Sequence, residues 1–351
     1  MFYNGTVVIS PTASGSLFLD SSALLNGTLS ARDNPALENF TCHMNPRLDD
    51  DRENHLFPPN SLRLNFTLHN LSSLVSFSVS HPFTRALVAD SLPSLKSFEI
   101  WGPEGTHYQP VFRNVTLVDL PKLREMTYEE DTIGAPVSEA LVIRNAGLDR
   151  IDPFFVARET EREFTAEVSG IPNVHHFNYS LQSRGAVSIA GNSNLSFQIV
   201  RSPCYSEHDV HTGNLTLSGL SSFSVLRPIN KSEPENQMAG YGVYIDTLRV
   251  HDNENLVTLP LNIDRMQNLA IVKNPRLATM LSVWHSSYWA WDEMVISGNP
   301  LLRFNSSVVV TDEFAAAKRQ NRSWPLTTDF YWPRYNVNTI VLEGHFDNAF
   351  L

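Results

Sequence analysis

The segment Leu269-Ala270-Ile271-Val272-Lys273-Asn274-Pro275-Arg276-Leu277 contains the pattern that decides the fold of this chain. Two apolar residues separated by one, Leu269 and Ile271, predict a short strand with both side chains on its inner face. An asparagine follows three residues later, and a closing leucine three residues after that. Because proline has no N–H to donate, Pro275 marks the point where strand pairing ends. We expect the chain to bend there and the closing leucine to turn back into the core.

This pattern recurs along the chain, and its strand residues return every 21 to 33 positions between 117 and 296. Such a period is typical of a solenoid, in which each coil places one short strand above the last and only stacking buries enough apolar surface. The sequence therefore predicts an all-β, right-handed β-solenoid with few short helices. The other clear copies begin at Val115, Val168, Val187, Leu215, Leu248 and Met294, and the weaker ones at Leu29, Phe66, Leu87 and Leu141.

Asparagine occupies the same phase of the pattern in several coils. An inward asparagine can donate to and accept from backbone groups of adjacent coils, which satisfies groups exposed where a strand ends. Leucine fills the position elsewhere, as at Leu71, Leu120 and Leu220. We expect a structural ladder of stacked side chains at Asn34, Asn192, Asn253, Asn274 and Asn299.

The pattern also suggests how the chain is divided. We expect irregular N-terminal coils in residues 1–60, solenoid repeats in residues 61–303, and a terminal coil with an aromatic-rich insertion in residues 304–351. The repeats form either one array or two halves that divide near 228–240.

Composition excludes several classes of protein. The 351 residues are 42% hydrophobic and 18% charged, which is typical of a folded chain rather than a disordered tail. The formal net charge is −11, and no basic cluster is longer than Lys318-Arg319. We therefore expect no nucleic-acid partner. No run approaches the roughly 18 apolar residues needed to span a bilayer.

The chain is rich in acceptor sites for N-glycosylation. Twelve Asn-x-Ser/Thr sequons occur, whereas chance would give about four or five. This excess favours a secreted glycoprotein with an extracellular, cell-surface or cell-wall location. The expected sites are Asn4, Asn26, Asn39, Asn65, Asn70, Asn114, Asn178, Asn194, Asn214, Asn230, Asn305 and Asn321.

The two ends and the cysteines qualify this interpretation. Residues 1–6 lack the pattern of a signal peptide and residues 347–351 lack that of a lipid-anchor signal, so we expect both signals to be missing from this chain. Cys42 and Cys204 are the only cysteines. One bridge between them is an alternative, but we favour two unpaired thiols because distant coils seldom meet.

Strings such as Ile271–Leu277 and Ile296-Ser297-Gly298-Asn299-Pro300-Leu301-Leu302 resemble receptor L-domain repeats, which are similar to leucine-rich repeats. Together with the dense sequons, they most resemble the fungal GPI-anchored cell-wall organisation proteins. The closing Ile340–Gly344 is similar to a late strand of that family. The resemblance covers residues 111–302 well and residues 61–110 loosely. It implies a cell-surface protein held to the membrane only through a lipid anchor.

Other polar and aromatic groups suggest chemistry less strongly. His175-His176 has no metal-ligand cluster at the required spacing, and adjacent strand residues point to opposite faces. Asp49–Asp51 and Glu129–Asp131 lie in polar stretches that we interpret as solvated loops rather than the carboxylate pair of a glycosidase. The aromatic clusters Trp284–Trp291 and Trp324–Tyr335 are either a cap on the last coils or a platform for sugars.

These observations favour a non-catalytic cell-surface glycoprotein with a structural or adhesive role in fungal cell-wall organisation. Its expected partners are cell-wall polysaccharide or cell-surface proteins, and we expect no cofactor, metal or catalytic residue. Two alternatives stay open at this point: a secreted polysaccharide-active β-helix enzyme, and a receptor ectodomain that uses the same fold to bind a ligand.

Overall fold

The structure of the chain is a computed structural model that describes most of its coils. It covers residues 2–21, 24–44, 64–80, 84–101, 112–128, 137–155, 163–179, 183–200, 210–225, 243–261, 263, 265–281, 293–304, 339–343 and 345–346. The chain forms two compact units, Met1–Val174 and His175–Leu351. The boundary expected near 228–240 lies outside the described residues, as do the aromatic clusters and the expected short helix at 311–318.

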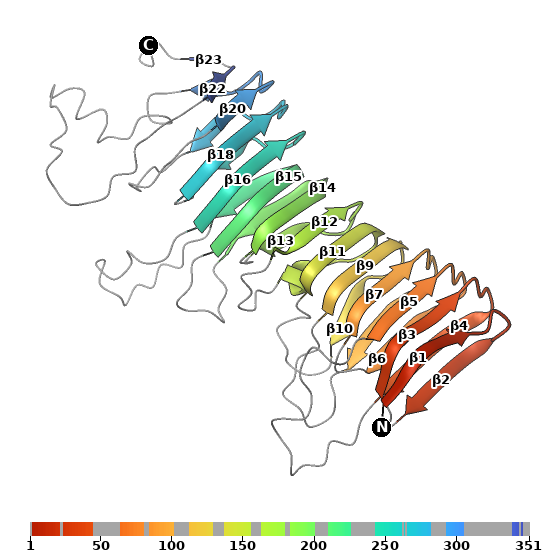
Figure 1. Cartoon of the computed structure of the whole chain (residues 1–351). Helices are drawn as coiled ribbons and strands as arrows, with labels where there is room; N and C mark the ends of the chain where they lie inside the picture. Colours follow the sequence, from red (N-terminus) through yellow and green to blue (C-terminus); the bar gives the residue numbers. More distant parts are fainter. Residues whose placement is uncertain are drawn as a thin grey trace, which may run out of the picture. The chain divides into compact units, whose positions relative to one another are not determined.

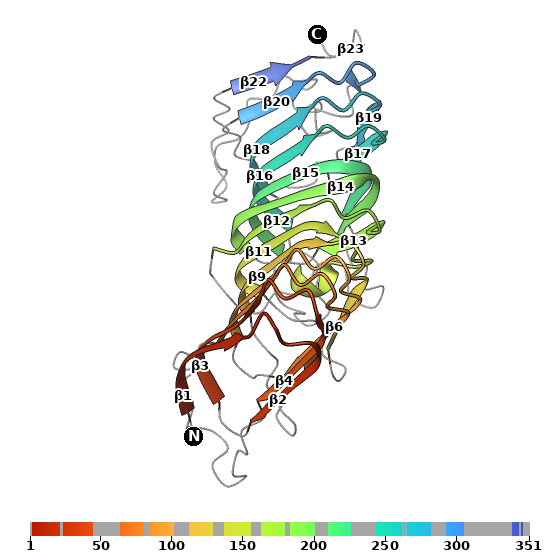
Figure 2. The ribbon, with the colours of Figure 1, turned by 90° about the vertical axis from the view of Figure 1, so that its right-hand side faces the viewer.

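The first unit contains two parallel sheets, which Figures 1 and 2 show as separate layers. The strand order is β1-β3-β5-β7-β9-β11-β12 in the longer sheet and β10-β8-β6-β4-β2 in the shorter one. A 3₁₀ helix, η2 (Asp152–Phe155), follows β11. The longer sheet consists of β1 (Phe2–Ile9), β3 (Leu24–Arg32), β5 (Leu64–His69), β7 (Thr84–Asp90), β9 (Phe112–Leu120), β11 (Val137–Ala146) and β12 (Thr165–Ser169). The shorter sheet consists of β2 (Gly15–Ser21), β4 (Leu37–Met44), β6 (Ser76–Ser80), β8 (Ser97–Trp101) and β10 (Glu125–Tyr128).

The second unit repeats this arrangement. Its main sheet has the order β14-β15-β16-β18-β20-β22, and β13 (His176–Tyr179) also pairs with β14. Two shorter pairs, β17 with β19 and β21 with β23, lie in separate sheets. The strands are β14 (Ser183–Ile199), β15 (Val210–Val225), β16 (Val243–His251), β17 (Thr258–Pro260), β18 (Arg265–Val272), β19 (Thr279–Leu281), β20 (Glu293–Ser297), β21 (Arg303–Phe304), β22 (Thr339–Leu342) and β23 (His345–Phe346).

The stacked parallel coils confirm the predicted β-solenoid. The apolar residues at alternate strand positions are buried, and the registers place them above one another in successive coils, as for Leu29, Phe66 and Leu87. Phenylalanines stack in the same way on the shorter sheet, where ring centroids are 5.4 Å apart for Phe40–Phe77 and 5.0 Å apart for Phe77–Phe98. Apolar side chains therefore pack against neighbouring coils as well as within one coil, where the ring centroids of Phe66 and Phe77 are 6.0 Å apart.

A residue in the left-handed backbone conformation follows the main strand of most coils. In this region the Cβ of a side chain lies too close to the following carbonyl oxygen, which glycine avoids because it has no Cβ. Asn and Asp tolerate the region because their short polar side chains can form local hydrogen bonds. The left-handed residue breaks the strand just before the chain bends towards the next face. In the first unit these residues are Asp33, Asn70, Ser91, Asp119, Asn145 and Gly170, with φ between 51° and 60°, and in the second they include Gly219, Asp252, Lys273 and Gly298, with φ between 54° and 66°.

Candidate functional site

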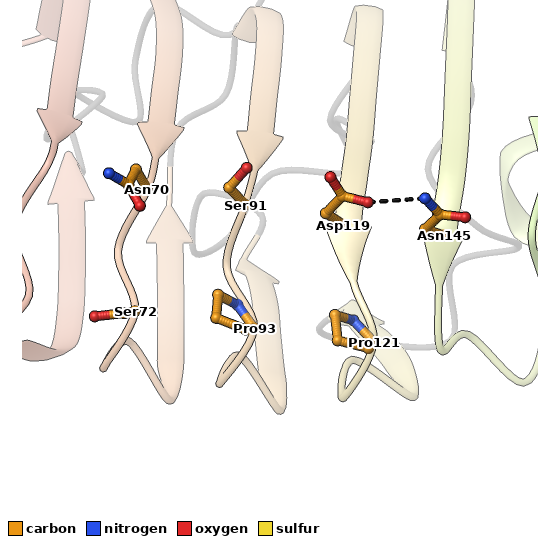
Figure 3. Close-up of a pocket in the computed structure, with 7 residues that line it drawn as sticks. All are labelled: Asn70, Ser72, Ser91, Pro93, Asp119, Pro121 and Asn145. Carbon is orange, nitrogen blue, oxygen red and sulfur yellow. Dashed lines mark hydrogen bonds between the residues drawn. The ribbon is translucent and has the colours of Figure 1, made fainter.

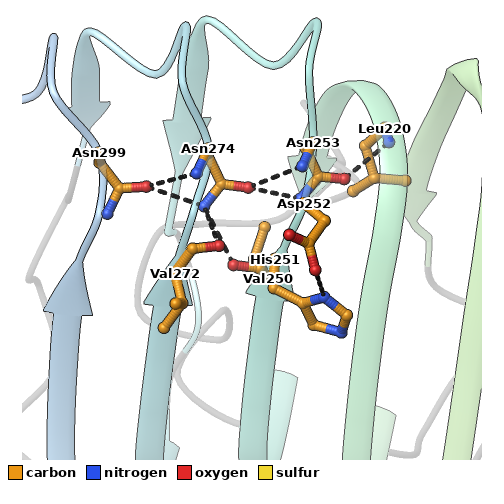
Figure 4. Close-up of polar contacts among 8 residues, drawn as sticks. All are labelled: Leu220, Val250, His251, Asp252, Asn253, Val272, Asn274 and Asn299. Carbon is orange, nitrogen blue, oxygen red and sulfur yellow. Dashed lines mark hydrogen bonds and ion pairs between the residues drawn. The ribbon is translucent and has the colours of Figure 1, made fainter.

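Three of the expected ladder asparagines lie together inside the second unit (Figure 4). Asn253, Asn274 and Asn299 are buried at the ends of β16, β18 and β20, on three successive coils. The side-chain Nδ2 of Asn253 donates to Oδ1 of Asn274 at 2.7 Å, and Nδ2 of Asn274 donates to Oδ1 of Asn299 at 3.0 Å. The amides therefore form one hydrogen-bonded chain along the stack.

The same side chains also satisfy backbone groups that the bend would otherwise leave unpaired. The backbone N–H of Asn274 donates to Oδ1 of Asn299 at 2.9 Å, and the backbone N–H of Leu220 donates to Oδ1 of Asn253 at 2.7 Å. Nδ2 of Asn274 also reaches the carbonyl of Val250 at 3.1 Å. Because buried backbone groups cost free energy when they are unpaired, the ladder is a structural element rather than a reactive one.

Asn34 makes a comparable set of contacts in the first unit. Its Nδ2 donates to the carbonyl of Ser10 at 2.9 Å, and its Oδ1 accepts from the N–H groups of Ala36 and Leu37, each at 3.0 Å. The side chain is fully buried. Leu71 holds the same phase in the next coil, so Asn34 bonds to backbone groups instead of to a stacked amide.

Asn192 departs from the predicted ladder. Four residues, 191–194, lie between Ala190 and Leu195 of β14, whereas Gly219 alone lies between their partners Ser218 and Leu220 of β15. This bulge moves the ladder position to Leu195, which is buried opposite Leu220. Asn192 is left partly exposed, where its Oδ1 accepts from the backbone N–H of Asn194 at 2.9 Å.

The described sequons lie at several different places on the coils. Asn65 and Asn114 are half-exposed and share one column of the first unit, because both pair with Ala86 of the strand between them. Asn214 is exposed at the corresponding phase of the second unit, and Asn70, Asn178 and Asn194 are exposed as well.

Asn39 is half-buried and bonds to Ser16 and Ser76. The strand registers place Asn4 opposite Asn26, and Asn230, Asn305 and Asn321 lie outside the described residues.

Among the residues that the structure describes, the remaining candidates from the sequence are two adjacent histidines. His175 and His176 are both exposed. The described part of the chain contains no group of three His, Cys, Asp or Glu side chains placed to hold a metal ion. Asp49–Asp51 and Glu129–Asp131 lie outside that part. Among the residues that the structure describes, no helix is long and apolar enough to cross a membrane.

Cys42 is a buried free thiol on β4, whereas Cys204 lies outside the described residues. Burial raises the pKa of the Cys42 thiol from 9.0 to about 12. We expect Cys42 in a Cys204→Ser variant to resist a thiol reagent at pH 8, because its thiolate fraction falls about a thousandfold and the sulfur is covered. Absorbance from Ellman's reagent should appear only on addition of denaturant, and rapid reaction of the native protein would contradict the burial.

Comparison of the chain with protein families, with curated proteins and with solved structures found no match.

Proposed function

We propose that this chain is a non-catalytic cell-surface glycoprotein with a structural or adhesive role in fungal cell-wall organisation. The observation that carries the proposal is the excess of sequons, twelve in 351 residues. The fold supports it, because the stacked strands place sequon asparagines such as Asn65 and Asn114 in one outward column of the first unit. The sequon asparagines whose exposure the structure describes are exposed or half-exposed, as an acceptor of a glycan must be; they are Asn39, Asn65, Asn70, Asn114, Asn178, Asn194 and Asn214.

The spacing of the acceptors is compatible with a dense layer of glycans. Asn65 and Asn114 are separated by one coil, and neighbouring strands lie about 4.8 Å apart, so the two acceptors are about 10 Å from each other. The threonine of each sequon, Thr67 or Thr116, is half-exposed like the asparagine and lies on the same outward face of the strand. The glycans would therefore project from the same side of the first unit.

The proposed partners are cell-wall polysaccharide or other cell-surface proteins, with no cofactor and with a lipid anchor as the route to a membrane. A bulky, glycosylated and acidic solenoid suits spacing and adhesion in a wall. The resemblance of Ile271–Leu277 and Ile296–Leu302 to receptor L-domain repeats supports the family assignment within this proposal.

Intact-mass measurement tests the proposal. We expect the protein secreted from a fungal host with an added signal peptide to lose several glycan masses on treatment with an N-glycosidase. Asn214→Gln should remove one glycan, because Asn214 is exposed on β15. Asn255→Gln is the matched control, since Asn255 is followed by Leu256-Val257 and is not a sequon. A mass unchanged by the glycosidase would contradict the proposal.

A further inference from the structure

A groove of about 350 Å³ crosses four coils of the first unit (Figure 3). It lies where β5, β7, β9 and β11 end and the chain bends towards the second sheet. Its lining is formed by Asn70, Ser72, Ser91, Pro93, Asp119, Pro121 and Asn145.

The lining consists of two parallel rows that repeat from coil to coil. The polar row contains the left-handed residues Asn70, Ser91, Asp119 and Asn145, one from each coil. They follow strand residues that pair directly in register, so successive members lie about 4.8 Å apart. The second row, two residues further along each coil, contains Ser72, Pro93 and Pro121, all exposed.

Two backbone amides along the polar row are not available to a ligand. The backbone N–H of Asn70 donates to the carbonyl of Asp90, and that of Ser91 donates to the carbonyl of Val118, both at 3.0 Å. These amides are therefore already engaged by the next coil. An extended peptide binds chiefly through main-chain hydrogen bonds, which these two amides no longer offer.

The polar row keeps acceptors for a ligand with hydroxyl groups. Nδ2 of Asn145 donates to Oδ1 of Asp119 at 2.9 Å, which leaves Oδ2 of Asp119 as a further acceptor. Among the described residues that line the groove, the carboxylate of Asp119 is the only charged group, and none is a lysine or arginine. The groove therefore favours an uncharged ligand over a polyanion.

We propose that this groove binds a linear, uncharged polysaccharide, with one sugar unit on each coil. The coil spacing is close to the advance of one hexose in an extended chain, so successive units meet successive members of the polar row. Its hydroxyl groups bond to the polar row, and the apolar face of its ring packs on Pro93 or Pro121. The inference deepens the proposed function, on which it rests for the cell wall as the source of the polymer.

A glycan on Asn70 is compatible with this ligand. Asn70 belongs to a sequon and lies at one end of the groove. Its Nδ2 points towards the preceding coil, where it donates to Oδ1 of Asp33 at 2.8 Å, and not towards Ser91 (Figure 3). A glycan attached to that nitrogen would extend over the preceding coil and leave Ser91, Asp119 and Asn145 accessible.

Titration of the full chain, expressed without glycans, tests the inference. The probes are β-1,3-glucan, β-1,4-glucan and mannan oligosaccharides of one to six units, followed by calorimetry or ligand-observed NMR. For one of these polymers we expect affinity to increase with each added unit up to about four and then to level off, because four coils line the groove. An affinity that does not depend on length, or no binding by any of the three series, would overturn the inference.

Matched glycine variants locate the binding. Asp119→Gly removes the carboxylate and keeps the left-handed backbone, since glycine holds this position at Gly170 and Gly219. We expect it to weaken binding about tenfold, the loss of one or two hydrogen bonds to a charged group. Asp252→Gly changes the same kind of residue outside the groove, at φ 54° as for Asp119, and should leave the affinity unchanged. Equal effects of the two variants would overturn the inference.

A second pair of variants covers the case in which Asp119→Gly does not fold. Pro121→Ala removes one ring of the groove, and Pro275→Ala is its counterpart outside it. Only the first should weaken binding. Binding of gelatin, an extended polypeptide, that Pro121→Ala abolishes would reassign the groove to peptides. The mass test for glycans and this titration are independent, so the proposed function and the groove can fail separately.

Discussion

Replacing Asn274 with alanine is expected to lower the free energy of unfolding of the second unit by about 3 kcal/mol, the upper end of the cost of leaving buried polar groups unpaired. The amide of Asn274 is the middle member of the ladder. Its loss leaves the backbone N–H and Nδ2 of Asn253 without their acceptor, and Oδ1 of Asn299 without one donor. Denaturant unfolding followed by circular dichroism gives the difference.

Asn268→Ala is the matched control on the same strand. Asn268 is half-exposed on β18 and donates to Oγ1 of Thr247 at 3.3 Å. Its replacement should cost less than about 0.5 kcal/mol, as surface substitutions usually do. Equal losses for the two variants would show that the ladder does not stabilise the stack through its buried bonds.

Replacing Gly219 with alanine is expected to destabilise the second unit by about 3 kcal/mol or more, because two costs add at this position. Gly219 has φ 66°, where a side chain costs about 1–2 kcal/mol. A Cβ would also lie 2.6 Å from the backbone carbonyl oxygen of Gly191 in the adjacent coil. Backbone atoms that are held by hydrogen bonds between strands move little, so the overpacking lowers stability by about 1–3 kcal/mol more.

Gly298→Ala separates these two costs. Gly298 has the same φ of 66°, but its nearest contact for a Cβ is at 3.4 Å, to Lys273. We expect only the backbone cost of about 1–2 kcal/mol here, from the left-handed conformation alone. A thermal unfolding series with both variants measures the difference, and a smaller loss for Gly219→Ala than for Gly298→Ala would contradict the close approach of the two coils.

The repeating pattern of apolar residues was sufficient to predict the solenoid. Alternate apolar positions point to one face, so Leu269 and Ile271 could be placed inside, and four buried asparagines followed from the same phase. The prediction that Asn192 lies in the buried ladder was wrong, because the pattern does not distinguish a strand that continues regularly from one that contains a bulge. Only the pairing of Ala190 with Ser218 and of Leu195 with Leu220 reveals the extra residues.

The groove could not be predicted from the apolar pattern. Its residues are exposed or, for Ser91, half-exposed, and the pattern constrains only the side chains that face the core. The sequence nevertheless indicated the polar row. Asn70, Asp119 and Asn145 each come directly before the buried residue at the end of the strand, and Asn and Asp accept the left-handed conformation. What the sequence did not contain was the lateral alignment of these residues, which depends on the register between strands.

The registers also have a consequence for how the protein is made. Hydrogen bonds between neighbouring coils join residues that are close in the chain, such as 21 positions apart for Asn253 and Asn274 and 23 for Arg144 and Glu167. In the described sheets each new strand pairs with the strand of a neighbouring coil, so a coil can use the coil before it as its template. The solenoid can accordingly be assembled from its N-terminal end while synthesis is still in progress, with each new coil completed as its residues emerge.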